Sequence, residues 1–150
     1  MYHNFVKAYQ QTQFLTANPL RLILMCYEGA INSLKTAKEY YLAKEYEKKA
    51  RELQKTLNIL HELMQSLDFE KGGQIANNLR SLYQYLLQRI IEGDLKQDMT
   101  AFDEAISHLD ELAVAWRNIA AGDRTTAVPP MQPFIESVNN KASLFRSRQV

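Results

Sequence analysis

The sequence predicts an all-α protein: an antiparallel up-down-up-down four-helix bundle with an N-terminal apolar arm and a C-terminal extension. Three observations predict it. Apolar residues recur at spacings of three and four along four successive stretches, which is typical of helices that share one buried seam. Glycine and proline fall mostly between these stretches. No stretch alternates apolar and polar residues with a period of two, so we expect no sheet.

The first helix is predicted to begin at Asn18-Pro19 and to continue to about Tyr41. Asparagine can accept hydrogen bonds from the free N–H groups of the first turn, and proline suits the first helical position. Gly29 costs about 1 kcal/mol against alanine inside a helix, so we expect a packing reason for it. The seam of this helix is Leu20, Ile23 or Leu24, Tyr27, Ile31, Leu34 and Tyr41.

The other three helices follow from the same spacing. The second has the seam Tyr46, Ala50, Leu53, Leu57, Leu60, Met64 and Leu67. The third has Ile75, Leu79, Leu82, Leu86 and Ile90, and the fourth has Leu95, Met99, Phe102, Ile106, Leu109, Ala113 and Trp116.

Short connections are predicted near Ala43-Lys44, from Asp68 to Gly73 and from Gly93 to Lys96. Loops of this length force neighbouring helices to run antiparallel. We assign residues 1–121 to the bundle domain with its arm. Residues 122–150 form a flexible or loosely docked tail, because their glycine and three prolines cannot continue the last helix.

Composition and charge exclude several classes of function. A formal net charge of +1 over 150 residues does not attract nucleic acid or an anionic membrane. The longest purely apolar run, Leu22 to Tyr27, is far below the roughly 20 residues that span a bilayer. The first seven residues show no secretory signal, and a single cysteine, Cys26, suits a reducing compartment. We expect a soluble cytoplasmic protein without membrane insertion.

No pattern for catalysis is found. Di-iron bundles carry Glu-x-x-His on two helices, but Asn58 stands three residues before His61 and Ala105 three before His108. Cys26 has no histidine near it in sequence to act as its base. Motifs such as GxSxG and GxGxxG are missing. We predict no enzyme, no catalytic residue, no metal and no cofactor.

Apolar residues away from the seam indicate a binding surface. Leu22, Met25 and Cys26 lie opposite the seam, so the first helix is apolar nearly all round, unlike a bundle helix with one face in water. Gly29, one turn further, would let another backbone approach closely. For any single residue, a wider core stripe is an equal alternative. Further candidates are Tyr83, Tyr85, Leu112 and Ile119.

A cover for this surface is available just upstream. The first fifteen residues hold Tyr2, Phe5, Val6, Tyr9, Phe14 and Leu15. The polar run from Gln10 to Gln13 argues against a fifth full helix. An apolar arm of weak intrinsic structure can lie in a groove and be displaced, and a permanently packed N-terminal cap is the open alternative.

Several strings resemble the flagellin export chaperones, the flagellar secretion chaperone family. They are Asn18-Pro19 with Leu22 to Ile31, the stretch from Glu62 to Leu79, Tyr83 to Tyr85, and Leu109 to Leu112 with Trp116. The chain departs from the family pattern in two places. Cys26-Tyr27-Glu28-Gly29 replaces the usual Leu-Tyr-Asp-Gly, and Arg21 stands where an acidic residue is common. Neither departure removes an apolar groove.

The resemblance implies a chaperone that binds the C-terminal segment of flagellin, blocks premature polymerisation and delivers the subunit to the flagellar export apparatus. It implies no nucleotide or metal. The client-binding residues are then Leu22, Met25, Cys26, Tyr27, Gly29, Tyr83, Tyr85 and Leu112. The displaceable arm contains Tyr9, Phe14 and Leu15. Export-apparatus components or a co-chaperone stay open as further partners, and the expected state is a monomer or weak homodimer.

Two alternatives remain at this point. The same apolar face could mate with its own copy in a self-assembling structural bundle. The tail beyond residue 122 carries Phe134, Ile135, Val138 and Leu144-Phe145, so it could sit in cis on the client surface, or it could simply be disordered.

Overall fold

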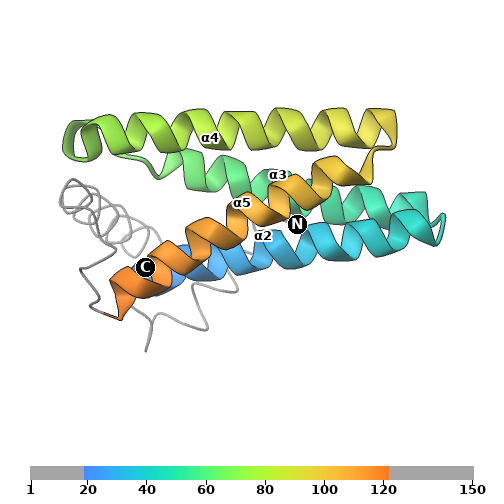
Figure 1. Ribbon diagram of the computed structural model, residues 1–150, viewed down its shortest axis with the longest axis horizontal. Coiled ribbons are helices and arrows are strands. Elements are labelled where there is room, and N and C mark those ends of the chain that lie inside the picture. Colours follow the sequence, from blue (N-terminus) through green and yellow to red (C-terminus); the bar gives the residue numbers. More distant parts are fainter. Residues whose placement is uncertain (1–18, 122–150) are drawn as a thin grey trace, which may run out of the picture.

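Four antiparallel helices form the described part of the protein, residues 19–121 of a computed structural model (Figure 1). They are α2 (Pro19–Leu42), α3 (Tyr46–Gln65), α4 (Phe69–Lys96) and α5 (Met99–Ala120). Successive helices run in opposite directions, and α2 and α4 each pack against both α3 and α5. No strand occurs within residues 19–121. The predicted up-down-up-down bundle is confirmed.

Most of the predicted seam residues form the core. Burying one such aliphatic or aromatic side chain contributes about 1.5–3 kcal/mol, so these residues account for the packing of the four helices. The fully buried side chains of largest volume are Trp116, Tyr27, Tyr83, Phe102, Leu34, Ile59, Leu60, Leu86, Ile90 and Leu109.

The seam prediction is wrong at the end of the bundle that holds the α2–α3 and α4–α5 connections. Tyr46 and Leu95 are 50% and 79% exposed. Tyr46 is the first residue of α3, where the neighbouring helices provide little cover. Leu95 belongs to α4, and its five-residue distance from the buried Ile90 turns it well away from the core. Ala50 is also exposed.

α4 is longer than predicted at its start, because the stretch after Asp68 is helix rather than loop. One carboxylate oxygen of Asp68 accepts the backbone N–H groups of Glu70 at 3.0 Å and Lys71 at 3.2 Å, which caps the first turn. Gly73 then interrupts the helix with φ 53° and ψ −128°, a conformation that only glycine adopts readily. The glycine pair therefore marks a kink within α4.

The stretch from Gly93 to Lys96 also belongs to α4, and the predicted loop there is wrong. A Cβ atom at Gly93 would lie 2.6 Å from the Cβ of Ala101, so this glycine allows α4 and α5 to approach closely. The helix ends at Lys96, and the next residue, Gln97, caps it with a left-handed φ of 55°. The α4–α5 connection is consequently shorter than expected.

No helix within residues 19–121 has the combination of length and hydropathy that a membrane span requires. The arm residues Tyr9, Phe14 and Leu15 and the tail from residue 122 lie outside the described residues. The division of the chain at residue 121 stays a prediction.

Candidate functional site

The start of α2 carries five consecutive apolar residues that are only partly buried. They are Leu22, Ile23, Leu24, Met25 and Cys26. A helix turns about 100° per residue, so these side chains point in every direction around the axis. Met25 lies two residues before Tyr27, which is fully buried, and is therefore turned about 200° from it. Met25 is thus directed away from the core.

Cys26 lies on the side of α2 that faces α3. Its half-buried side chain packs against the core cluster. Burial, with a smaller contribution from the negative charge of Glu62, raises the pKa of Cys26 to about 12. A thiol with this pKa is neutral near pH 7 and a poor nucleophile. The environment therefore favours packing by Cys26 over covalent chemistry.

A hydrogen-bonded cluster of three aromatic residues lies directly behind this surface. Trp116 Nε1 donates to the hydroxyl of Tyr27 at 3.0 Å, and the hydroxyls of Tyr27 and Tyr83 are hydrogen-bonded to each other. The rings of Tyr27 and Trp116 are stacked, with centroids 6.4 Å apart. Because the three residues come from α2, α4 and α5, the cluster ties the start of α2 to two other helices.

Three of the predicted client-binding residues are buried in the bundle. Tyr27 and Tyr83 have exposed fractions of 0% and 1%, and Gly29 is buried as well. Burial raises the pKa of both hydroxyls, so both stay neutral. Their role in client binding stays a prediction, but in this structure they are core residues that position the surface above them.

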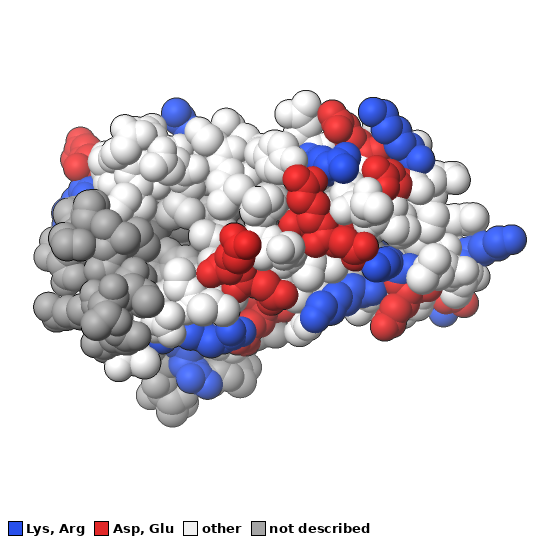
Figure 2. All heavy atoms as spheres, in the orientation of Figure 1, with Lys and Arg blue, Asp and Glu red and all other residues white. Residues whose placement is uncertain are grey.

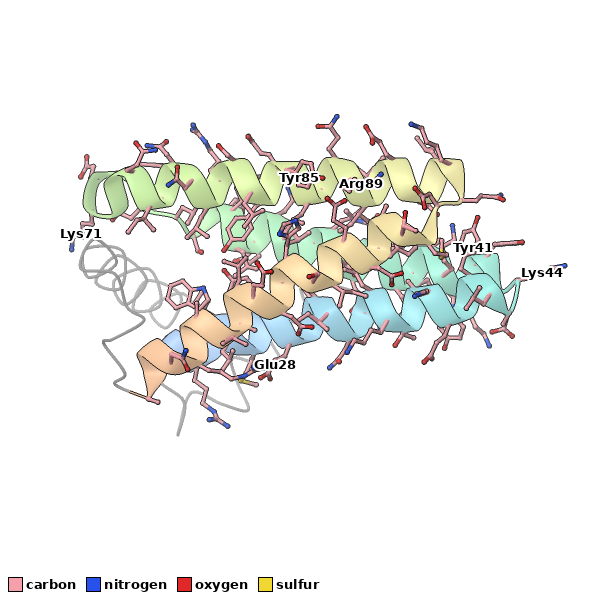
Figure 3. The ribbon with its side chains drawn as sticks, in the orientation of Figure 1. Glu28, Tyr41, Lys44, Lys71, Tyr85 and Arg89 are labelled. Carbon is pink, nitrogen blue, oxygen red and sulfur yellow. The ribbon has the colours of Figure 1, made fainter. Side chains whose placement is uncertain are left out.

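Tyr85 lies on the flank of α4 that faces α5 (Figure 3). It is 44% exposed, and its hydroxyl donates to Glu104 at 2.5 Å. Arg89 Nε donates to the other oxygen of the same carboxylate at 2.6 Å. The hydrogen bonds from Tyr85 and Arg89 lower the pKa of Glu104. Tyr85 is therefore held by a polar network and not free to turn outward.

The same α4–α5 flank is apolar further from the connection between the two helices. Leu112 of α5 is half-buried and packs against the core, and so do Ile75 and Leu82 of α4. Figure 1 shows that α4 and α5 diverge from their connection toward this end. Leu82 and Ile75 precede Arg89, which pairs with Glu104 of α5, by seven and fourteen residues and so share its side of α4. Leu112 follows His108, whose ring contacts Tyr85 of α4, by one turn. We call Ile75, Leu82 and Leu112 the α4–α5 flank residues. Sequence periodicity assigned Ile75 and Leu82 to the seam, and no sequence signal marked them as partly accessible.

The charged residues are unevenly spread over the face seen in Figure 2. Lys, Arg, Asp and Glu gather over the C-terminal half of α4 and the beginning of α5, whereas the surface over the N-terminal half of α4 is largely uncharged. Within residues 19–121 no group of three or more His, Cys, Asp or Glu side chains is placed to hold a metal ion. What the described residues assemble is an apolar surface on a rigid helical support.

The structure therefore places the predicted site residues in two groups. Leu22, Met25 and Cys26 are partly accessible at the start of α2, and Tyr85 and Leu112 are partly accessible on the α4–α5 flank. The core contact between Tyr27 and Tyr83 links the two groups through the bundle. The side chain of Ile119 lies outside the described residues.

An accessible apolar surface on a helical bundle is typical of proteins that bind other proteins. The family profile described as "Flagellar protein FliS" matches residues 1–123. The chain is 35% identical over 120 residues to the "Flagellar secretion chaperone FliS" of Salmonella typhimurium, covering 77% of this chain and 89% of the relative. It is 32% identical over 119 residues to the "Flagellar secretion chaperone FliSB" of Pseudomonas aeruginosa, covering 77% and 94%.

The relative from Campylobacter jejuni, also named "Flagellar secretion chaperone FliS", is 32% identical over 112 residues, covering 75% of this chain and 88% of the relative. The chain belongs to the FliS family, a family of chaperones and not of enzymes. The resemblance that the sequence strings indicated is confirmed.

Proposed function

We propose that this protein is a cytoplasmic export chaperone that binds the disordered C-terminal segment of flagellin. It would prevent premature polymerisation and support delivery to the flagellar type III export apparatus. The names of the relatives as flagellar secretion chaperones support this class of activity. The observation that carries the proposal is the run from Leu22 to Cys26, five consecutive apolar residues of which none is fully buried.

The physical basis is recognition of an apolar helix face in a groove, coupled to folding of the client. A segment that is disordered before binding loses conformational entropy when it becomes helical, which costs about 2–5 kcal/mol or more of the interaction energy. The resulting affinity is moderate. This suits an export client, because the client must later be released. Neither step needs a nucleotide or a metal.

The accessible residues are assigned direct contact with the client. They are Leu22, Met25 and Cys26 on α2 and Tyr85 and Leu112 on the α4–α5 flank. The buried residues Tyr27, Gly29 and Tyr83 are assigned the indirect role of fixing where α2 presents those contacts. The arm residues Tyr9, Phe14 and Leu15 are proposed to cover the surface until a client displaces them.

Copurification tests the proposed function. The full chain is coexpressed with a tagged C-terminal fragment of flagellin, and the complex is sized by light scattering over a dilution series. We expect comigration at about one to one, and we expect added chaperone to delay the polymerisation of monomeric flagellin. A dimer that persists on dilution and does not bind the fragment would contradict the proposal and favour the self-assembling bundle.

A further inference from the structure

The C-terminal extension leaves the bundle beside the proposed client surface. α5 ends at Ala120, and its last turns lie next to the start of α2, where Arg117 Nη2 is 3.5 Å from the carboxylate of Glu28. The family profile stops at residue 123, so residues 124–150 are an addition to the matched region. Any contact made by this addition starts at the end of the bundle that carries Leu22 and Leu112.

The sequence of the extension has the pattern of an amphipathic helix. Pro133 suits the first position of a helix, and the apolar residues that follow it recur at spacings of three and four. They are Phe134, Ile135, Val138, Ala142 and Phe145, whereas Leu144 falls outside this stripe. Glu136 and Asn140 fall on the opposite side of such a helix. A single helix of this length is marginal in water, so its stability requires an apolar surface to pack against.

The length of the extension matches the α4–α5 flank. Residues 122–130 can extend about 30 Å, which lets the chain turn back along the bundle. A helix over residues 133–146 is about 21 Å long, enough to span the distance from Ile75 to Tyr85, about 15 Å along α4. Residues 122–150 hold four Lys or Arg and two Asp or Glu, whereas residues 19–121 hold thirteen and fifteen. The two parts therefore have opposite net charge, which favours association of the extension with the bundle as a whole and does not select the flank.

We propose that residues 133–146 form an amphipathic helix that docks in cis on the α4–α5 flank residues Ile75, Leu82 and Leu112, and competes there with the client. The competition rests on the proposed function, whereas the docking does not. A docked extension lowers the apparent association constant for client to its intrinsic value multiplied by the fraction of molecules whose flank is free. Export cargo must then displace a built-in competitor before it is bound.

Amide hydrogen exchange on the full chain tests the docking without any flagellin. We expect protection over residues 134–146 in the wild type and in Asn140→Asp, and exchange at the rate of the isolated peptide in Val138→Asp. The two variants introduce the same charge on opposite sides of the helix. Equal exchange in both variants, or an unprotected wild-type extension, overturns the proposal. Protection that is lost on dilution also overturns it, because docking in cis does not depend on concentration.

A second matched pair tests the location of the docked helix. Leu112 is half-buried on the flank, whereas Val114 on the same helix is exposed. We expect Leu112→Gln to remove the protection of residues 134–146 and Val114→Gln to leave it intact. Circular dichroism verifies that both variants keep the helix content of the bundle. Retained protection in a folded Leu112→Gln protein overturns the proposed location.

Titration with a C-terminal flagellin fragment tests the competition. If the extension is docked nine-tenths of the time, Val138→Asp binds about tenfold more tightly than the wild type, and Asn140→Asp binds as the wild type does. The increase in affinity of Val138→Asp over the wild type must equal the factor calculated from the docked fraction that hydrogen exchange gives for the wild type. Unchanged affinity in Val138→Asp overturns the competition. If none of the three proteins binds the fragment, the proposed function fails, while the exchange data still decide the docking.

Discussion

The hydroxyl of Tyr27 connects three helices through polar atoms inside an apolar core. It accepts the indole N–H of Trp116 and is hydrogen-bonded to the hydroxyl of Tyr83. Buried polar groups are tolerated only when they are hydrogen-bonded, so each of these residues depends on the others. The cluster fixes the position of α2 immediately after the accessible run from Leu22 to Cys26.

Replacing Tyr27 with Phe is expected to destabilise the bundle by about 1–3 kcal/mol, because the buried Tyr83 hydroxyl loses its partner. The matched control is Tyr85→Phe, which removes an exposed hydroxyl that donates to Glu104 and should cost about 1 kcal/mol or less. Urea unfolding followed by circular dichroism measures both. If both variants lose the same free energy of unfolding, the buried hydrogen bonds of Tyr27 do not stabilise the bundle as described.

Cys26 is expected to react slowly while the protein is folded. With its pKa raised to about 12, the thiolate fraction at pH 8 is about a thousandfold lower than that of an ordinary thiol. A colorimetric disulfide reagent at pH 8, added to the native and to the urea-unfolded protein, measures the difference. Rates within about threefold of each other would contradict the raised pKa of this thiol.

The raised pKa of Cys26 also predicts how stability depends on pH. The folded state keeps its proton to higher pH than the unfolded state, whose thiol has a pKa of about 8.5. Stability is therefore complete below that value and falls as pH rises from there toward 12, by up to about 1.4 kcal/mol per pH unit. Unfolding free energies from pH 8 to 10 should decline in the wild type, and the decline should be flatter in Cys26→Ala. Parallel slopes would contradict this.

At the scale of elements, the glycines of α4 serve two different purposes. Gly73 provides a backbone conformation with φ 53° that kinks the helix near its start. Gly93 instead removes a side chain where α4 meets α5, since a Cβ there would lie 2.6 Å from the Cβ of Ala101 and 3.1 Å from the carbonyl oxygen of Asp98. Contact between the helices is therefore closest near their connection, and they diverge toward the end of the bundle where α2 begins (Figure 1).

Gly93→Ala is expected to destabilise the protein by about 1–3 kcal/mol through overpacking, although alanine is the better helix former by about 1 kcal/mol. Adding Ala101→Gly removes the opposing methyl group and should recover part of the loss, despite the cost of glycine in α5. Thermal or urea unfolding of the two single variants and the double variant gives the coupling. Strictly additive effects would contradict the contact.

Helix number, order and direction could be predicted from the sequence, because a buried seam leaves a periodicity of three and four. The bounds of α2 and the connection near Ala43-Lys44 could be predicted too. The ends of α4 could not, because Gly93 is a residue typical of turns and only its distance to Ala101 shows that it is a contact between helices. The run from Leu22 to Cys26 was predictable as well, because its apolar residues exceed what one buried face requires. The burial of Tyr83 was harder to predict, since its partner Tyr27 lies 56 residues away in the sequence.

At the scale of the whole molecule, the proposed client surface lies at one end of a bundle that ion pairs reinforce along its length. Lys38 and Asp103, 2.6 Å apart, join α2 to α5, and Lys49 and Asp94, also 2.6 Å apart, join α3 to α4. Such partly exposed pairs each contribute about 1 kcal/mol or less. Together with the buried aromatic cluster they hold the four helices to one another.

Titration of a disordered C-terminal flagellin fragment into the full chain, followed by circular dichroism, tests the central claim most directly. The account predicts a gain of helix that saturates at about one to one. Met25→Asp should weaken binding about thirtyfold or more, since losing one apolar contact and burying a charge costs about 2 kcal/mol or more. Gln84→Asp, on the exposed side of α4, should bind as the wild type does. A folded Met25→Asp protein that binds with unchanged affinity would contradict the account.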